Sequence, residues 1–189
     1  MVSIDRDRLV LSTDNFKLIQ MMMEKIMKVN GLEISFDNIM KKHYGMVYHL
    51  AYTQLNNSHN ADDICQEVFM SLYGYDKVFN SEEHLKAWLL RVAINRCRKI
   101  WNNKWYKYVV CTDNIDIYES HDRYKSEIEY AVKELPKKYR MLIHLYYYED
   151  LSIKEIADIV HQKESTIASA LDRARKILRS KLKEDYDFE

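Results

Sequence analysis

The sequence predicts an all-α protein made of two small helical domains joined by a linker. Only 3 glycines and 1 proline occur in 189 residues, a scarcity of turn formers that disfavours an all-β fold and favours long helices. From Phe36 onward, apolar residues recur at helical spacing. Between residues 151 and 182, two short amphipathic segments flank a polar turn, which is the pattern of a helix-turn-helix.

The local signals of this helix-turn-helix are strong. Ser152 and Glu155 have the spacing of a capping box, and Leu151 and Ile156 fit a hydrophobic staple. The apolar face of the first helix comprises Ile153, Ile156, Ala157 and Val160, and that of the second comprises Ile167, Leu171, Ala174 and Leu178. The second helix of such a motif can enter the major groove of DNA.

The composition limits the classes of protein that remain. Hydrophobic residues make up 47% and charged residues 31%, which predicts a globular chain, and 29 basic residues balance 29 acidic ones. Cys65, Cys97 and Cys111 are too widely spaced for a zinc motif, so we expect reduced cysteines, no metal and no cofactor. There is no signal peptide and no apolar run of about 20 residues, so we expect a cytoplasmic protein without direct membrane insertion.

We interpret residues 1–35 as an N-terminal extension without an activity of its own. Within it, the pattern from Phe16 to Val29 predicts a short amphipathic helix.

Residues 36–108 are expected to form the first domain. A helix runs from Phe36 to Leu55, and a polar turn follows in which Asn60 can cap the next helix. This second helix begins at Ala61, so its acidic residues lie near its positive end. Its polar side carries Asp62, Asp63, Gln66 and Glu67. That side is either a solvated face or a docking surface for a basic partner.

A loop from Gly74 to Asn80 precedes a third long helix, which Ser81 can cap. Basic and polar residues on its free face and lower end are Lys86, Arg91, Asn95, Arg96, Arg98, Lys99 and Lys104, with Trp101, Trp105, Tyr106 and Tyr108 among them. Cations neutralise phosphates and aromatic rings stack on unpaired bases, so this mixture indicates nucleic-acid binding. An interpretation of equal weight is that these aromatic rings cover a small hydrophobic core.

A polar, acidic linker is expected at residues 109–124 and a second domain at 125–185. This domain begins with a helix that carries Ile128, Ala131, Val132 and Leu135. Pro136 then fits the first turn of a helix that leads to the helix-turn-helix.

Three stretches in this order resemble the extracytoplasmic-function sigma factors of bacterial RNA polymerase. Residues 61–69 (ADDICQEVF) are similar to the family's polymerase-docking segment. Residues 84–95 (HLKAWLLRVAIN) are similar to the helix shared by its melting and minus-ten recognition segments. The third stretch comprises LPKKYR at 135–140, DLSIKEIA at 150–157 and LDRAR at 171–175, and it resembles region 4, which reads the minus-thirty-five element.

The resemblance implies a role for each set of residues. Asp62, Asp63, Gln66 and Glu67 would bind core RNA polymerase. Lys77, Asn80, Arg91, Asn95, Arg98 and Lys99 would contact minus-ten promoter DNA, with Asn80 in a loop from Lys77 to Glu83 that holds a flipped base. Lys163, Ser165, Thr166, Ser169, Arg173, Arg175 and Lys176 would contact the minus-thirty-five element. The family also implies an anti-sigma factor as inhibitor, and no catalytic residue in this chain.

The chain departs from the family pattern in the helix-turn-helix. His161 stands where the turn usually has glycine, and Ala168 and Ala170 stand where the recognition helix often has Lys or Arg. Two alternatives remain at this stage. A stand-alone helix-turn-helix regulator would leave the acidic and basic-aromatic surfaces of the first domain without a role. An enzyme acting on nucleic acid would need a phosphate loop, a metal pair or a nucleophile with its base, and none is recognisable.

Overall fold

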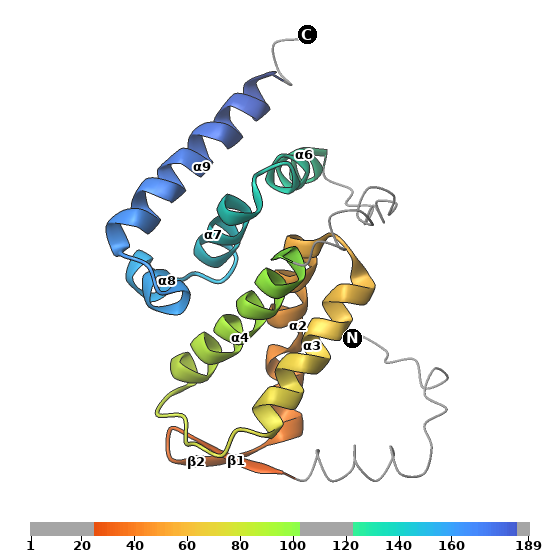
Figure 1. The fold of residues 1–189 in the computed structure, drawn as a ribbon, viewed down its shortest axis with the longest axis vertical. Coiled ribbons are helices and arrows are strands. Elements are labelled where there is room, and N and C mark those ends of the chain that lie inside the picture. The colour runs from red at the N-terminus through yellow and green to blue at the C-terminus, as the bar shows by residue number, and fades with distance from the viewer. Residues whose placement is uncertain (1–24, 103–122, 185–189) are drawn as a thin grey trace.

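The computed structural model describes residues 25–102 and 123–184, and most of them are helical (Figure 1). The elements in chain order are β1 (Ile26–Val29), β2 (Leu32–Ser35), α2 (Phe36–Leu55), α3 (Ser58–Tyr73), α4 (Glu82–Asn102), α6 (Arg123–Lys133), α7 (Lys137–Tyr147), α8 (Ile153–Val160) and α9 (Glu164–Glu184). The predicted all-α class is therefore confirmed, with one small two-stranded sheet in addition.

The first group of helices, α2, α3 and α4, packs around a shared apolar core, with the hairpin at one end (Figure 1). The predicted apolar faces are buried: Val47, Leu50, Ile64, Leu72, Leu85 and Leu89 are each at most 1% exposed. Ser35 caps α2 by accepting a hydrogen bond from the Asn38 amide, and Asn56 ends it in the left-handed region.

The start of α3 differs from the prediction. Asn57, not Asn60, is the N-cap, and its Oδ1 accepts a 2.8 Å hydrogen bond from the Asn60 amide. Both asparagines are suitable caps, and the chain uses the earlier one because an additional turn can then form. Asp62 and Asp63 therefore lie beyond the first turn of α3, and the expected compensation of the positive helix end by these carboxylates was wrong.

The helix expected from Phe16 to Val29 was also wrong for its last residues, which form β1 of an antiparallel hairpin; residues 16–24 lie outside the described part of the chain. Asn30 and Gly31 both have positive φ values, 53° and 75°, as a tight hairpin turn requires. Along β1, Met27 and Val29 are buried while their neighbours are exposed, so the true period is two.

The second group contains α6, α7 and the helix-turn-helix of α8 and α9. The capping box of Ser152 and Glu155 is confirmed, since both of its reciprocal hydrogen bonds form. His161 ends α8 with φ 57° and ψ 52°. The turn therefore adopts the left-handed backbone conformation although histidine replaces the usual glycine. Pro136 is the N-cap of α7, one residue before the predicted position.

The two groups of helices pack directly against each other, α2 on α7 and α4 on α8. Arg140 of α7 donates a 3.0 Å hydrogen bond to the Thr53 carbonyl, near the end of α2. Arg91 of α4 donates a 3.2 Å hydrogen bond to the Asp158 carbonyl, near the end of α8. Each arginine thus satisfies a carbonyl in the last turn of a helix from the other group, where no intrahelical donor is available.

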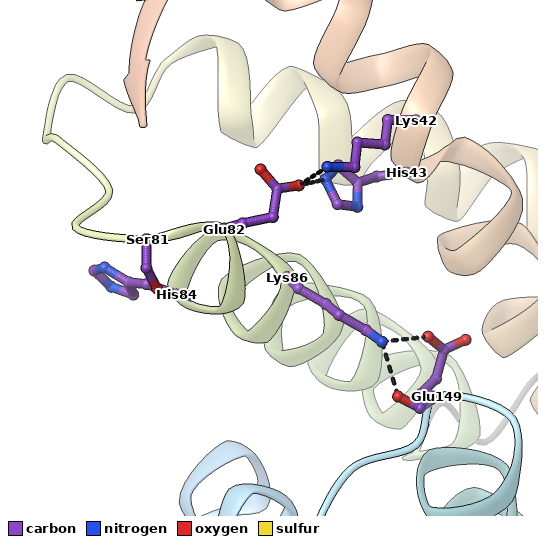
Figure 2. A network of polar contacts seen from close by, with 7 residues as sticks. All are labelled: Lys42, His43, Ser81, Glu82, His84, Lys86 and Glu149. Atoms are coloured by element: carbon purple, nitrogen blue, oxygen red, sulfur yellow. Dashed lines mark hydrogen bonds and ion pairs between the residues drawn. The ribbon is translucent and has the colours of Figure 1, made fainter. Parts of the chain in front are cut away.

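A lysine adds a third contact between the groups (Figure 2). The Lys86 ammonium lies 3.1 Å from the Glu149 carboxylate and donates a 2.8 Å hydrogen bond to the Glu149 carbonyl. Buried His144 lies 3.5 Å from the same carboxylate. Burial alone would raise the pKa of Glu149, but the nearby His144 and the Lys86 ammonium outweigh it and lower that pKa. Glu149 is therefore an ionised acceptor at the boundary between the groups.

We predict that Lys86→Met weakens this packing, because it removes the lysine from a carboxylate whose side chain is only 11% exposed. Such a charge-assisted hydrogen bond is worth about 1.5–3 kcal/mol. Small-angle scattering of the free chain should show a larger radius of gyration, and the unfolding midpoint should fall.

Lys42→Met is the matched control. Lys42 pairs with Glu82 inside the first group, and its side chain is 63% exposed (Figure 2). It should change stability by less than about 1 kcal/mol and leave the radius unchanged. Equal radii for both variants would show that Lys86 does not hold the groups together.

Candidate polymerase-docking and promoter-binding surfaces

The acidic side of α3 forms one wall of an open cleft whose other wall is α4. The cleft has a volume of about 690 Å³ and is lined by Asp63, Gln66, Glu67, Met70, Ser71, Arg96 and Lys99. Arg96 crosses it and lies 3.2 Å from the Glu67 carboxylate. Three of the four residues predicted to bind polymerase therefore share one surface.

Asp62, the fourth predicted residue, lies toward α2 instead. It accepts a 3.0 Å hydrogen bond from the Tyr44 hydroxyl. Burial, followed by this hydrogen bond, raises the pKa of Tyr44 well above its ordinary value. Asp62 remains exposed, so a contact with a partner would be made at the edge shared by α2 and α3.

The last residues of the loop between α3 and α4 are held in place at Phe79 and at Ser81. The buried Phe79 ring packs 5.0 Å from Tyr75 and 5.9 Å from Trp88, measured between ring centroids. Ser81 caps α4 through a 3.1 Å hydrogen bond from the His84 amide, which confirms the predicted cap (Figure 2). The Asn80 amide donates to His84 Nδ1 at 3.3 Å. Exposed Asn80 thus lies between Phe79 and Ser81, both of which are held in place.

The first residue of α4 is tied to α2. Glu82 Oε1 lies 2.7 Å from His43 Nε2 and 2.8 Å from the Lys42 ammonium (Figure 2). Burial lowers the pKa of His43 and outweighs the opposing effect of Glu82, so the imidazole is neutral at pH 7 and donates from Nε2. These contacts fix the direction in which α4 leaves the loop.

The predicted DNA face of α4 is divided. Asn95 and Lys99 are exposed and Arg98 is half-buried, whereas Arg91 is engaged by the carbonyl of Asp158. Lys99 lies in the same cleft as the docking residues of α3. Trp101 lies under the Lys137 ammonium, 5.5 Å from its ring centroid, so this ring serves the packing between the groups. Lys104, Trp105, Tyr106 and Tyr108 lie outside the described residues.

The N-terminal end of α9 is open to solvent. Lys163, Ser165, Thr166, Ser169, Arg173 and Lys176 are all exposed. Ile167, Leu171 and Ala174 are at most 2% exposed and anchor the opposite face. The start of α9 therefore presents the Ser165 and Thr166 hydroxyls and the Lys163 ammonium at the positive end of the helix, where phosphates can bind, beside the acidic Glu164 of the first turn.

Arg175 occupies a different face of α9. Its Nε donates a 3.0 Å hydrogen bond to the Tyr147 hydroxyl, and its guanidinium lies 5.4 Å from the Tyr146 ring centroid. Arg175 thus packs on α7, away from the exposed predicted residues.

Sequence reasoning missed two features near these surfaces. The Asn30-Gly31 pair is a strong signal for a hairpin and could have revealed β1 and β2. The pairing of Lys86 with Glu149 joins residues 63 positions apart, and no sequence pattern announces it.

Among the described residues, no three His, Cys, Asp or Glu side chains gather as metal ligands would. Burial raises the pKa of both Cys65 and Cys97 to about 12, so these two are protonated thiols. No helix in residues 25–102 or 123–184 is both long and apolar enough to span a membrane.

Comparison with known proteins decides the family. The model for Sigma-70 region 2 matches residues 39–106, and the model for Sigma-70, region 4 matches residues 125–178. The ECF RNA polymerase sigma factor SigW of Bacillus subtilis is 29% identical over 185 residues, which cover 87% of this chain and 99% of SigW. The chain belongs to the extracytoplasmic-function (ECF) sigma factors. Sigma factor SigV of the same organism is also 29% identical, over 73% of this chain and 86% of SigV.

Solved structures share the fold of this sigma factor. RpoE of Bartonella quintana, crystallised with the anti-sigma factor NepR, has a TM-score of 0.60 and 23% identity, and the match covers 78% of this chain and 96% of RpoE. CnrH in complex with the cytosolic domain of CnrY has a TM-score of 0.57 and 19% identity, over 79% of this chain and 88% of CnrH.

The neutral, buried His43 makes the stability of this sigma factor depend on pH. Its folded-state pKa lies below the ordinary value of 6.5. Its contribution to the free energy of unfolding is therefore complete above about pH 6.5 and is lost as the pH falls through the lower folded-state pKa. We predict that urea denaturation of the wild-type chain shows this loss and that His43→Gln abolishes it. His49→Gln, on the same helix, should retain it. A pH dependence that survives in His43→Gln would contradict the assignment.

Proposed function

We propose that this sigma factor directs promoter recognition and opening through three surfaces, for the specialised, stress- or envelope-type regulon of an ECF sigma factor. The acidic side of α3 binds core polymerase, the loop before α4 captures a minus-ten base, and α9 reads the minus-thirty-five element. The observation that carries the proposal is that Asp63 on α3, Asn80 in the loop before α4 and Lys163 before α9 are all exposed on one chain.

The polymerase contact rests on charge. Asp62, Asp63, Gln66 and Glu67 are exposed along α3. A basic partner surface would gain from these carboxylates, and complementary charge speeds association and selects the partner. Because Arg96 already neutralises part of Glu67, we assign the greater share of the charge contact to Asp62 and Asp63.

The minus-ten contact rests on the loop. Asn80 offers an amide that can both donate to and accept from a base edge, while Lys77 is an exposed cation three residues earlier. Holding an unstacked base offsets part of the cost of opening the duplex, a few kcal/mol per step. Asn95, Arg98, Lys99 and Arg91 would then hold the adjacent backbone.

The minus-thirty-five contact rests on the first turns of α9. Lys163, Ser165, Thr166 and Ser169 surround a helix N-terminus, and Arg173 and Lys176 follow on exposed positions. Arg175 would contact the minus-thirty-five element only after breaking its hydrogen bond with the Tyr147 hydroxyl. The linker at 109–124 would set the distance between this contact and the minus-ten contact.

We assign no catalytic step to this chain, since nucleotide addition belongs to the polymerase, and we place it in the cytoplasm with that enzyme. We also propose regulation by an anti-sigma factor. The support is that RpoE of Bartonella quintana, which shares this fold, was crystallised with one.

The proposal is tested by adding the purified chain to core RNA polymerase on a genomic promoter library and mapping the transcription start sites. We expect initiation at one promoter class with shared minus-ten and minus-thirty-five elements. Silence of the core enzyme across the library would overturn the proposal, and tight duplex binding without polymerase would instead favour a stand-alone regulator.

Reversing charge in the triple variant Asp62→Lys, Asp63→Lys, Glu67→Lys should weaken core binding at least about tenfold, because like charges would then face a basic surface. Fluorescence anisotropy of labelled chain against core polymerase measures it, and circular dichroism checks the fold. Glu33→Lys, an exposed reversal on β2, is the control. Normal core affinity in the triple variant would show that α3 is not the docking surface.

Arg173→Ala should weaken binding of the mapped minus-thirty-five duplex more than it slows promoter opening. If Arg173 contacts a phosphate, the slope of log K against log salt should fall by about 0.9; a base contact would cost about 1–3 kcal/mol. A salt titration measures the first, and permanganate footprinting follows opening. Lys138→Ala, an exposed lysine on α7, should leave both unchanged. Equal duplex affinity for Arg173→Ala and the wild type would remove Arg173 from the site.

A further inference from the structure

The N-terminal hairpin is bonded to the loop that we assign to the minus-ten base. The Phe79 amide donates a 3.0 Å hydrogen bond to the Lys28 carbonyl, and the Asn30 amide donates a 2.8 Å hydrogen bond to the Phe79 carbonyl. Val29 and Phe79 thereby form a parallel bridge, so the end of the loop acts as a third strand beside β1. Figure 1 shows the hairpin lying beside the chain that joins α3 to α4.

Lys25, just before β1, holds the beginning of the same loop. Its ammonium contacts the Tyr73 carbonyl at the end of α3, lies 4.9 Å from the Tyr73 ring centroid, and is 3.8 Å from the Asp76 carboxylate. The Lys25 carbonyl in turn accepts a 2.8 Å hydrogen bond from the Phe36 amide, which ties Lys25 to the start of α2.

These contacts leave little freedom to the residues between them. Phe79 is fully buried and bonded through both backbone groups, while Asn80 follows it directly and is bonded to His84. Lys77, Val78 and Asn80 are exposed on the segment so defined. The hairpin is itself anchored, because Met27 and Val29 are 4% and 1% exposed.

We propose that the hairpin Ile26–Ser35 is a positioning element that sets the base selectivity of the minus-ten loop. This inference rests on the proposed function of that loop. Asn30 and Lys25 are positioning residues: they act through Phe79 and Tyr73 and need not touch the DNA. Hydrogen bonds to a base edge are selective only when the donor and acceptor stay within about 0.5 Å of the productive position. A loop released from β1 would still reach DNA but would distinguish the bases less well.

The main test variant is Asn30→Pro. Proline has no amide to donate to the Phe79 carbonyl and cannot adopt the φ of 53° found at this position. Asn30→Gly is the matched control, since glycine keeps the amide and accepts a positive φ. Lys25→Met is a second, milder variant that leaves the hairpin turn intact, and Lys28→Met, an exposed lysine on the same strand, is its control.

The experiment uses holoenzyme reconstituted from core polymerase and each full-length chain. The probe is a mapped promoter carrying each of the four bases in turn at every unpaired minus-ten position, and the rate of open-complex formation is measured. We expect wild type, Asn30→Gly and Lys28→Met to prefer one base strongly at one position. Asn30→Pro should reduce that preference at least about tenfold and Lys25→Met about threefold, values of a size that one lost base contact allows. Core binding should stay within twofold of wild type.

Each other outcome has a defined meaning. Full base preference in both Asn30→Pro and Lys25→Met would overturn the proposal. Equal losses in Asn30→Pro and Asn30→Gly would also overturn it, because they would assign the effect to the Asn30 side chain. If Asn30→Pro fails to fold, the comparison of Lys25→Met with its control Lys28→Met decides the test alone. A wild-type holoenzyme without base preference at any minus-ten position would refute the proposed function of the loop and not the contact of the hairpin with it.

Discussion

Two arginines, each bound to the end of a helix in the other domain, are the contacts on which the arrangement of this sigma factor depends. A helix leaves its last carbonyls without partners, and burying them unpaired is costly. Arg140 satisfies the end of α2 and Arg91 the end of α8, so each domain completes a helix of the other. Lys86 and Glu149 add an ion pair beside them. The apolar residues of the two domains form one continuous core around these contacts.

One of these contacts is made by a residue that was predicted to bind DNA. Arg91 was predicted to hold minus-ten DNA, yet in the structure its guanidinium serves the Asp158 carbonyl, and its Nε is buried without a partner. Arg91 donates to the Asp158 carbonyl through one terminal nitrogen, so a bound phosphate would have to share the guanidinium with that carbonyl or displace it. A promoter contact that displaced this hydrogen bond would cost part of the contact between α4 and α8.

Most signals that act within a few residues were read correctly from the sequence, apart from the cap at Asn57 and the turn at Asn30-Gly31, whereas contacts with distant partners were not foreseen. The capping box at Ser152 and the cap at Ser81 are local, and the structure contains both. The hairpin was missed because the methionines and isoleucines before Asn30 also fit a helical period, and the local turn signal of Asn30-Gly31 was not used to decide between helix and strand. The engagement of Arg91 and Arg175 could not be foreseen, since it is decided by residues 67 and 28 positions away.

A net charge of zero is compatible with DNA binding here because the charges are distributed unevenly among the helices. The exposed acidic residues of α3 are Asp62, Asp63 and Glu67, whereas α9 carries the exposed cations Arg173, Arg175, Lys176 and Arg179 beside the acidic Glu164 and Asp172. A phosphate bound beside the start of α9, as proposed, would meet Lys163 and the positive end of the helix dipole, together with the acidic Glu164 of the first turn. More distant carboxylates would be screened within about 8 Å at physiological salt. The helix ends thus supply positive potential that a count of charges omits. On α4, by contrast, Arg96 and Lys99 line the same cleft as Asp63 and Glu67, so the proposed polymerase and promoter surfaces adjoin there.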